Sequence, residues 1–507
     1  MRLPFPIRIP LAYSAAYAVV LCVLQVFEGT PLYFSLCSFG FILLATVAFN
    51  LVGGFSRPSG GYIFFYSVVG VILGLTYKAY LGEPANSNLL APKTTMLAYL
   101  ASSFGMCCSA FFAHRLVPRR SLLEGMAERL DLGGAALGCI VLGLVIDLWG
   151  FIDVGLAGSS AGSLFSAVRQ LNNFMVLGII LGVTHTIRAS GGRRLISLPV
   201  GLAVTYFVLV HGILGFSKEG LLMPIVGVLI AAAAVRFRFS LVQICIFLLG
   251  MIFAFGYLVP LTQAGKLRMT TSLGENLNSA LDLATLDSNE LESATRESYE
   301  DADDFVVHYY DQSHGLFDRL QMISWDDALI DTTEQGHVYG LYPVLFSFMN
   351  VVPHFIWKDK PIIPLGNIYS HEIGFAHSAR DSDDTTTGIS FSPTGDAFHQ
   401  ARWLGVLVVA PALWLLCFFV MDWLCGDTRR SPWGLLMIAI CSHAAPEGML
   451  DGPVRLMTYG AFSIWLAAFL ATYVLPMLAS LLTGPKRRAI APTRRRSPAT
   501  DLGAGLS

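Results

Sequence analysis

The chain has 507 residues, of which 54% are hydrophobic and only 13% charged, and its formal net charge is -2. A soluble domain usually carries about 25% charged residues, so a chain of this composition cannot cover its own apolar surface in water. Its basic residues are spread over many short segments instead of forming one patch, which argues against nucleic acid as a partner. The nine cysteines lie in or beside apolar runs, without the spacing of a disulfide framework or a CxxC metal site.

Twelve apolar runs of about 17–25 residues are long enough to cross a hydrocarbon core of about 30 Å. They lie near residues 9–27, 31–53, 61–80, 94–114, 133–154, 170–188, 195–214, 219–235, 239–260, 403–423, 433–449 and 458–482. The first run follows Arg2 and Arg8 without a small-residue cleavage site, so we interpret it as a retained first helix. The run at 433–449 is the weakest, because it is short and contains His443 and Glu447. The sequence predicts an all-α polytopic membrane protein with eleven or twelve transmembrane helices.

The distribution of basic residues predicts the orientation of the chain. If the N-terminus faces the cytoplasm and all twelve runs cross, the inside segments collect 20 of the 33 Lys and Arg residues, as the positive-inside rule expects. Omitting the run at 433–449 would place the basic C-terminal tail outside. The same parity argues against a crossing by Val338–Trp357, which we interpret as a re-entrant or interfacial segment. Both termini are therefore predicted to be cytoplasmic.

The predicted outward segment differs in composition from the rest of the chain. Residues 261–400 contain 22 of the 35 acidic residues and seven of the 11 histidines. We expect four parts: an N-terminal bundle of about nine helices at 1–260, an outward-facing loop domain at 261–400 with the re-entrant segment at 338–357, C-terminal helices at 401–483, and a basic cytoplasmic tail at 484–507. Within the loop domain, residues 276–304 are predicted to be solvated surface.

Cations on the outer side are exceptions to the positive-inside bias and therefore mark a candidate binding site. The set consists of Lys218, Arg319, His354, Lys358, Lys360 and Arg402, with His211 close to Lys218 in the preceding apolar run. If they converge, they suit a dianionic head group such as a lipid pyrophosphate, since a cation about 4 Å from a phosphate gains roughly 4 kcal/mol at an effective dielectric of 20. The alternative is that each side chain extends to the membrane interface without a ligand.

Asp396 and His399 precede the tenth apolar run, and either is a candidate general base on a sugar hydroxyl. The alternative for each is a helix cap or an interfacial residue. Asp147 lies at membrane depth, where an ionisable residue is explained either by a function or by a buried polar partner. The outer histidines lack HxxxH or HExxH spacing and the chain lacks a Gly-rich phosphate loop, so neither a metal nor another cofactor is expected.

From about residue 200 to residue 425 the pattern resembles the Wzy-type bacterial polysaccharide polymerases, relatives of the O-antigen ligases. The most specific element is Pro353-His-Phe-Ile-Trp-Lys-Asp-Lys-Pro361, preceded by Tyr339-Gly340 and followed by Ser392-Pro-Thr-Gly-Asp396. A short outer Gly-Phe-Ser-Lys turn ending at Lys218 stands where family members often have Gly-Ser-Arg. In this chain His354 follows the proline where those proteins often have arginine.

The resemblance implies a GT-C-like architecture with a large periplasmic loop, in the bacterial inner membrane. It implies that a growing glycan leaves undecaprenyl pyrophosphate and joins a hydroxyl of the next lipid-linked repeat unit. Arg319 would then act with His399 and Asp396, while Lys218, Lys360 and His354 would hold the pyrophosphate. The implied partners are the lipid-linked oligosaccharide, membrane lipids, a chain-length regulator and a flippase. A glycan ligase, a polysaccharide transporter or flippase, and a non-catalytic scaffold are alternatives that the sequence does not separate.

Overall fold

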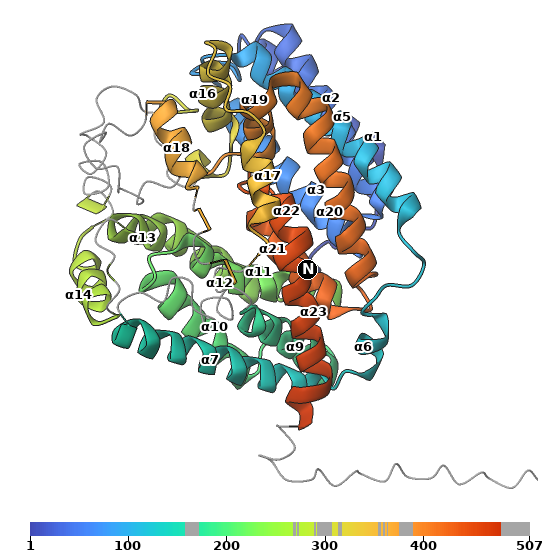
Figure 1. Ribbon diagram of the computed structural model, residues 1–507, viewed down its shortest axis with the longest axis vertical. Helices are drawn as coiled ribbons and strands as arrows, with labels where there is room; N and C mark the ends of the chain where they lie inside the picture. Colours follow the sequence, from blue (N-terminus) through green and yellow to red (C-terminus); the bar gives the residue numbers. More distant parts are fainter. Residues whose placement is uncertain are drawn as a thin grey trace, which may run out of the picture.

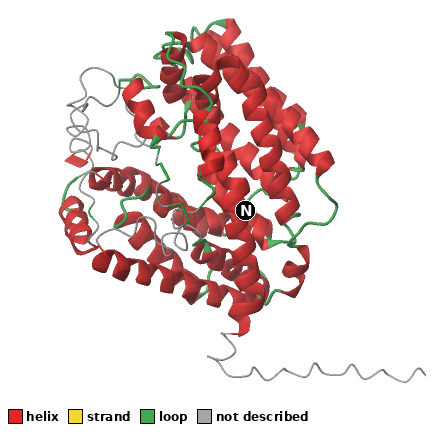
Figure 2. Ribbon diagram, in the orientation of Figure 1, coloured by secondary structure: helices red, strands yellow, loops and turns green. Residues whose placement is uncertain are grey.

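Helices joined by loops make up the computed structural model (Figure 2). It describes residues 1–157, 172–266, 270, 273–287, 290–291, 307–312, 317–352, 356–357, 360–361, 363–374 and 389–477. Within these ranges the one β-type pairing is an isolated bridge between Arg2 and Arg238. The prediction of an all-α chain is confirmed for this part of the molecule.

The elements follow one another in a long series of helices, several of them interrupted by one π-helical turn. The N-terminal part contains α1 (Leu11–Phe27), α2 (Leu32–Val52), η1 (Gly54–Ser56), α3 (Pro58–Ser67), η2 (Val68–Ile72), α4 (Leu73–Leu81), α5 (Pro92–Leu116), α6 (Glu124–Arg129) and α7 (Leu132–Ala157). The middle contains α9 (Phe174–Ala189), α10 (Leu198–Phe207), η3 (Val208–Ile213), α11 (Lys218–Ala234), α12 (Leu241–Phe253), η4 (Ala254–Leu258), α13 (Val259–Lys266) and α14 (Leu273–Ala284). The last part contains η5 (Phe317–Arg319), α16 (Ile323–Glu334), α17 (Tyr342–Met349), α18 (Leu365–Glu372), α19 (Pro393–Leu404), η6 (Gly405–Val409), α20 (Ala410–Cys425), α21 (Pro432–Ala444), α22 (Asp451–Arg455), η7 (Leu456–Gly460), α23 (Ala461–Phe469) and η8 (Leu470–Val474).

Among the described residues, seven helical stretches are long and apolar enough to cross a membrane. They are Leu32–Ser56, Pro58–Leu81, Pro92–Leu116, Leu132–Gly150, Leu241–Thr262, Pro393–Cys425 and Asp451–Met477. Four shorter apolar helices accompany them: Leu11–Phe27, Phe174–Ala189, Leu198–Ile213 and Pro432–Ala444. Together with α11, these helices coincide with the twelve predicted apolar spans. The chain is a multi-pass membrane protein.

Proline and glycine mark many of the helix ends. Pro58, Pro92 and Pro432 occupy the first turn of α3, α5 and α21, where the missing N–H of proline removes no helical hydrogen bond. Gly53 and Gly82 follow α2 and α4 with φ of 91° and 76°, a left-handed conformation that glycine adopts without steric cost. The local sequence therefore ends these helices where the apolar runs end.

The helices form two packed groups, and α21 makes the most extensive contacts between them (Figure 1). In the first group α2 packs against α1 and α5, and α5 packs against α20. In the second group α7 packs against α9, and α9 packs against α11. Helix α21 contacts α3 in one group and both α9 and α11 in the other. Because α21 is largely buried between them, it is part of the bundle core despite its short apolar run.

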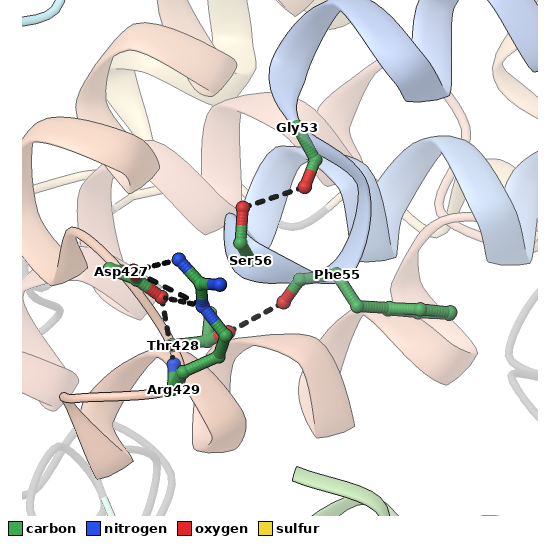
Figure 3. A network of polar contacts seen from close by, with 6 residues as sticks. All are labelled: Gly53, Phe55, Ser56, Asp427, Thr428 and Arg429. Carbon is green, nitrogen blue, oxygen red and sulfur yellow. Dashed lines mark hydrogen bonds and ion pairs between the residues drawn. The ribbon is translucent and has the colours of Figure 1, made fainter. Parts of the chain in front are cut away.

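The turn between α2 and α3 docks on the turn between α20 and α21. The backbone N–H and the hydroxyl of Ser59 donate to the two carboxylate oxygens of buried Asp422, at 3.1 and 2.7 Å. Thr428 donates its hydroxyl to the carbonyl of Phe55 at 2.5 Å (Figure 3). These bonds hold two Arg-bearing turns, far apart in the sequence, at the same end of the bundle.

Other loops that the charge bias assigns to the inside lie at this end too. The N–H of Leu122, in the loop after α5, donates to the carbonyl of Trp423 at 2.9 Å. The N-terminal amine of Met1 donates to the carbonyl of Phe239 at 2.7 Å, in the loop before α12. The N-terminal segment and the loops after α2, α5, α11 and α20 thus lie together at one end of the molecule, which we call the basic end.

The opposite end is covered by segments from the predicted outward region. Helix α16 lies on the loop between α4 and α5, where Asp327 accepts bonds from the N–H groups of Leu90 and Ala91 and from the hydroxyl of Thr95. Helices α16 and α18 and the segment just before α19 share a small separate apolar core that includes Leu329, Tyr369 and Phe391. This layer forms a cap over the helix bundle.

The predicted span at 403–423 belongs to a longer, sharply bent stretch, Pro393–Cys425. The backbone leaves helical geometry at Ala401 and Arg402, and Arg402 has φ 49° and ψ -136°. After the bend, η6 packs back against α19 so closely that a Cβ on Gly405 would lie 1.8 Å from the carbonyl oxygen of Ala397. The apolar run at 403–423 marks only the second part of this stretch. The two helical turns before it are polar in sequence and are buried by other parts of the protein.

The apolar segment at 338–357 contains one short helix, α17. Its eight residues span about 12 Å at 1.5 Å per residue, well below the roughly 30 Å of a hydrocarbon core. Pro343 lies in its first turn, and the helix packs against α22. Within the described residues this segment therefore does not cross. The predicted tail at 484–507 lies outside the described residues.

Candidate functional site in the cap

The Ser-Pro-Thr-Gly-Asp sequence at 392–396 is the start of α19, built on a carboxylate of α16. Ser392 caps α19 by accepting bonds from the N–H groups of Thr394 and Gly395, at 3.1 and 3.4 Å. The same Ser392 donates its N–H to Asp326 at 2.9 Å and its hydroxyl to the other oxygen of that carboxylate. Asp326 also accepts from Tyr99 of α5, at 2.5 Å. These hydrogen bonds fix the position of the N-terminal end of α19 relative to α16 and α5.

Asp396 is fully buried and both of its carboxylate oxygens accept hydrogen bonds from protein donors. The hydroxyl of Tyr369 and the amide of Gln400 donate to one oxygen at 2.9 and 2.7 Å, and the N–H of Leu450 donates to the other at 2.8 Å. Asp396 therefore joins α18, α19 and the segment before α22. This arrangement suits a positioning residue better than a base that must reach substrate.

His399 lies one turn further along α19, and the hydrogen bonds around it assign its tautomer. The hydroxyl of Thr333 donates its single proton to the carbonyl of Leu329 at 2.7 Å. At 2.9 Å from the Nδ1 atom of His399, the Thr333 oxygen must therefore act as acceptor. Nδ1 consequently carries a proton, and Nε2 is the atom available for acid–base chemistry.

That Nε2 atom lies 2.7 Å from a carboxylate oxygen of Glu372, at the C-terminal end of α18. Two unprotonated groups this close repel, which favours a proton on one of them, although the two side chains meet the distance of an ion pair and not the geometry of a hydrogen bond at Nε2. The His399 side chain is 0% exposed and the Glu372 side chain 29% exposed. The pair thus joins a buried imidazole to a carboxylate that reaches the surface of the cap.

Arg402 is the predicted cation that the structure brings next to this pair. Its side chain is exposed, and Nη2 donates to the carbonyl of Thr333 at 3.1 Å. Thr333 thus contacts both Arg402 and His399. Through Thr333, the cap thus brings the His399–Glu372 pair and the positive charge of Arg402 into one connected group of residues.

Two further carboxylates in α16 show how strongly the cap buries negative charge. Burial raises the pKa of Asp326 to about 6, against the lowering effect of its hydrogen bonds from Ser392 and Tyr99. Burial likewise raises the pKa of Asp327 to about 6, with Thr95 as the first opposing donor. Both carboxylates are held by neutral donors, so each retains part of its desolvation cost.

The other described candidates have different surroundings. The ammonium of Lys360 donates to the carbonyls of Asn350 and Val352, at 3.2 and 2.9 Å, and burial lowers its pKa. Lys218 is exposed in the first turn of α11, where Ser217 accepts a bond from the N–H of Gly220 and caps the helix. Lys360 therefore supports the chain around α17, and Lys218 lies at the start of a different helix.

His211 pairs with the intramembrane carboxylate that the sequence singles out. Its Nε2 lies 2.8 Å from Asp147, whose other oxygen accepts a bond from Asn172 at 3.0 Å. The ring of Phe207 stacks on the imidazole with centroids 4.4 Å apart. Asp147 thus has the buried polar partner that was one of its two expected explanations.

Three predicted site residues are not placed by the structure. His354 and Lys358 lie outside the described residues, and of Arg319 only the backbone, at the end of η5, is described. Conversely, sequence reasoning did not single out Glu372, Thr333 or Tyr369. Thr333 comes from α16, and Tyr369 and Glu372 come from α18, the helix before α19; none belongs to a motif that could have identified it.

Within the described part of the chain, no group of three or more His, Cys, Asp or Glu side chains is placed to hold a metal ion. No protein-family model matches the chain, and comparisons with curated proteins and with solved structures found no match. The site must therefore be interpreted from its own chemistry.

Proposed function

We propose that this chain polymerises lipid-linked oligosaccharide repeat units at the outer face of the bacterial inner membrane, as a membrane glycosyltransferase of the Wzy type. The observation that carries the proposal is the His399–Glu372 pair beside Arg402, in the cap over a multi-pass helix bundle. The sequence resemblance over residues 200–425 supports it. The positive-inside bias, which assigns the cap to the outer side, supports it as well.

Glycosyl transfer from a lipid pyrophosphate needs a base for the acceptor hydroxyl and positive charge for the leaving group. In the proposed step the acceptor oxygen forms a bond to the anomeric carbon as the bond from that carbon to the pyrophosphate oxygen breaks. The hydroxyl proton passes to Glu372, which His399 orients. The leaving group is undecaprenyl pyrophosphate, which keeps the electron pair of the broken bond. Arg402 is the described cation best placed to stabilise that charge. No nucleotide takes part.

Asp396 holds α18 and α19 together in this scheme and so positions the pair. Lys218, Arg319, His354 and Lys358 remain further proposed contacts of the glycan or pyrophosphate. Lys360 acts indirectly, because its ammonium is bound to backbone carbonyls.

The test is the glycan profile of a deletion strain complemented with Glu372→Gln or His399→Gln. Loss of general base catalysis typically costs 10²–10⁴-fold, so we expect single lipid-linked units to accumulate while the variant proteins reach normal levels. Long unattached chains would instead indicate a glycan ligase. Repeat units retained on the inner leaflet would indicate a flippase. Normal polymer in both variants would contradict the proposed site.

A further inference from the structure

A cavity of about 440 Å³ opens at the basic end, between the start of α1 and the C-terminal ends of α2 and α5. Its wall is mostly apolar and is formed by Leu11, Val47, Leu51 and Phe111. Leu11 and Phe111 are 48% and 37% exposed, and they belong to the apolar helices α1 and α5. The cavity therefore opens beside exposed apolar side chains of these two helices.

The rest of the lining is basic. Arg8, His114 and Arg115 contribute to the cavity, and none of the described residues that line it is acidic. Within the described residues these three side chains make no ion pair with a carboxylate. The guanidinium of Arg115 lies 4.4 Å from the centroid of the Phe111 ring, so charge and apolar wall adjoin. The site has an unbalanced positive charge.

The segment that carries Arg8 is held in place by a side chain of α2. Asn50 accepts a bond from the N–H of Ile9 and donates one to its carbonyl, both at 2.8 Å. Asn50 also lines the cavity, between these two elements. Because both backbone groups of Ile9 are bound, the neighbouring Arg8 has a backbone fixed at the edge of the cavity, which lowers the entropy lost on binding a ligand.

We infer that this cavity binds one anionic phospholipid of the adjacent leaflet. Arg8 precedes the first span and Arg115 ends the fourth, so both lie at the depth of the lipid headgroups. A phosphodiester between the two guanidinium groups matches their charge and hydrogen-bond donors. An acyl chain matches the apolar wall, which a free phosphate ion would leave unoccupied. Basic pockets between transmembrane helices bind lipid headgroups in this way.

The experiment titrates the detergent-solubilised full-length chain with short-chain phosphatidylglycerol and, separately, with phosphatidylcholine, and measures bound lipid by native mass spectrometry. Each basic residue near a membrane surface contributes roughly fivefold to the binding of anionic lipid, so the double variant R8Q/R115Q should bind phosphatidylglycerol roughly 25-fold more weakly. The matched control R119Q/R120Q removes two cations next to, but outside, the cavity and should bind as the parent does.

A second variant tests the shape of the cavity independently of its positive charge. Leu11→Trp adds volume at an exposed position of the cavity wall without altering any cation, and it should also lower phosphatidylglycerol binding. Equal binding of the two lipids by the parent would overturn the inference. So would equal losses in R8Q/R115Q and R119Q/R120Q, unchanged binding by Leu11→Trp, or displacement of the lipid by millimolar inorganic phosphate.

Discussion

Thr333 and His399 fix each other's hydrogen-bond roles across the cap. The Thr333 hydroxyl donates to the carbonyl of Leu329 and accepts from Nδ1 of the imidazole, which leaves Nε2 facing Glu372. Thr333 of α16 therefore determines which nitrogen of His399, on α19, is available for proton transfer. No sequence motif links the two residues.

Replacing Thr333 by valine should impair the proposed reaction without unfolding the cap. Valine has nearly the same shape but leaves the N–H at Nδ1 of His399 buried and unpaired, at a cost of about 1–3 kcal/mol. We expect polymer formation to fall roughly tenfold to a hundredfold, measured on isolated membranes with a lipid-linked acceptor. Thr333→Ser keeps the hydroxyl and is the control, with activity near that of the parent. Equal activity of the two variants would refute a role for the Thr333–His399 hydrogen bond in the reaction.

Arg402 offers a way to separate charge from backbone geometry. Its φ of 49° with ψ of -136° lies in a region that glycine adopts freely, so Arg402→Gly should leave thermal stability within about 1 kcal/mol of the parent. The same variant removes the cation next to the His399–Glu372 pair and should abolish polymer formation. Arg402→Lys restores charge and should restore part of the activity. A fully active glycine variant would remove Arg402 from the proposed site.

The buried carboxylates of α16 predict how stability depends on pH. Because the pKa of Asp326 is raised to about 6, the folded chain binds a proton between pH about 4 and about 6 that the unfolded chain has lost. Stability therefore falls as the pH rises through this window and is regained as the pH falls. Between pH 7.5 and 5.5 this one group should contribute about 1 kcal/mol. Melting curves of the purified chain test this, with Asp326→Asn as the comparison, which should show a smaller gain on acidification.

Asp422 in the last turns of α20 and Asp427 in the turn that follows should differ strongly in their effect on stability. Asp422→Ala leaves the N–H and the hydroxyl of buried Ser59 without their acceptor, which should cost about 2–3 kcal/mol. Asp427→Ala removes an ion pair with Arg429 whose side chains are 26% and 45% exposed, worth about 1 kcal/mol or less (Figure 3). Thermal inactivation followed by size-exclusion chromatography compares the two variants. A larger loss for Asp427→Ala would contradict the role assigned to Asp422.

The positions of the helices could be predicted from the sequence because the membrane imposes a length and a polarity on each one. All twelve predicted spans coincide with helices, and prolines and glycines such as Pro92 and Gly82 mark several of their ends. The largest boundary differences are at the run near 403–423, whose helical stretch begins at Pro393 with polar turns buried in protein, and at the runs near 433–449 and 458–482, whose helices end at Ala444 and begin at Asp451. The bend at Ala401 and Arg402 could not be predicted, because neither residue type breaks helices.

The chemistry of the candidate site depended on tertiary structure. His399, Asp396 and Arg402 were recognisable from their place before an apolar run, since polar side chains there must face the water or another polar group. Their partners Thr333, Tyr369 and Glu372 lie on helices that pack against α19 only in the folded chain. A carboxylate's partners are set by how helices pack, and no spacing within one helix encodes that. The sequence by itself therefore determined the spans, their order and their predicted sides, whereas packing alone decided which polar groups meet.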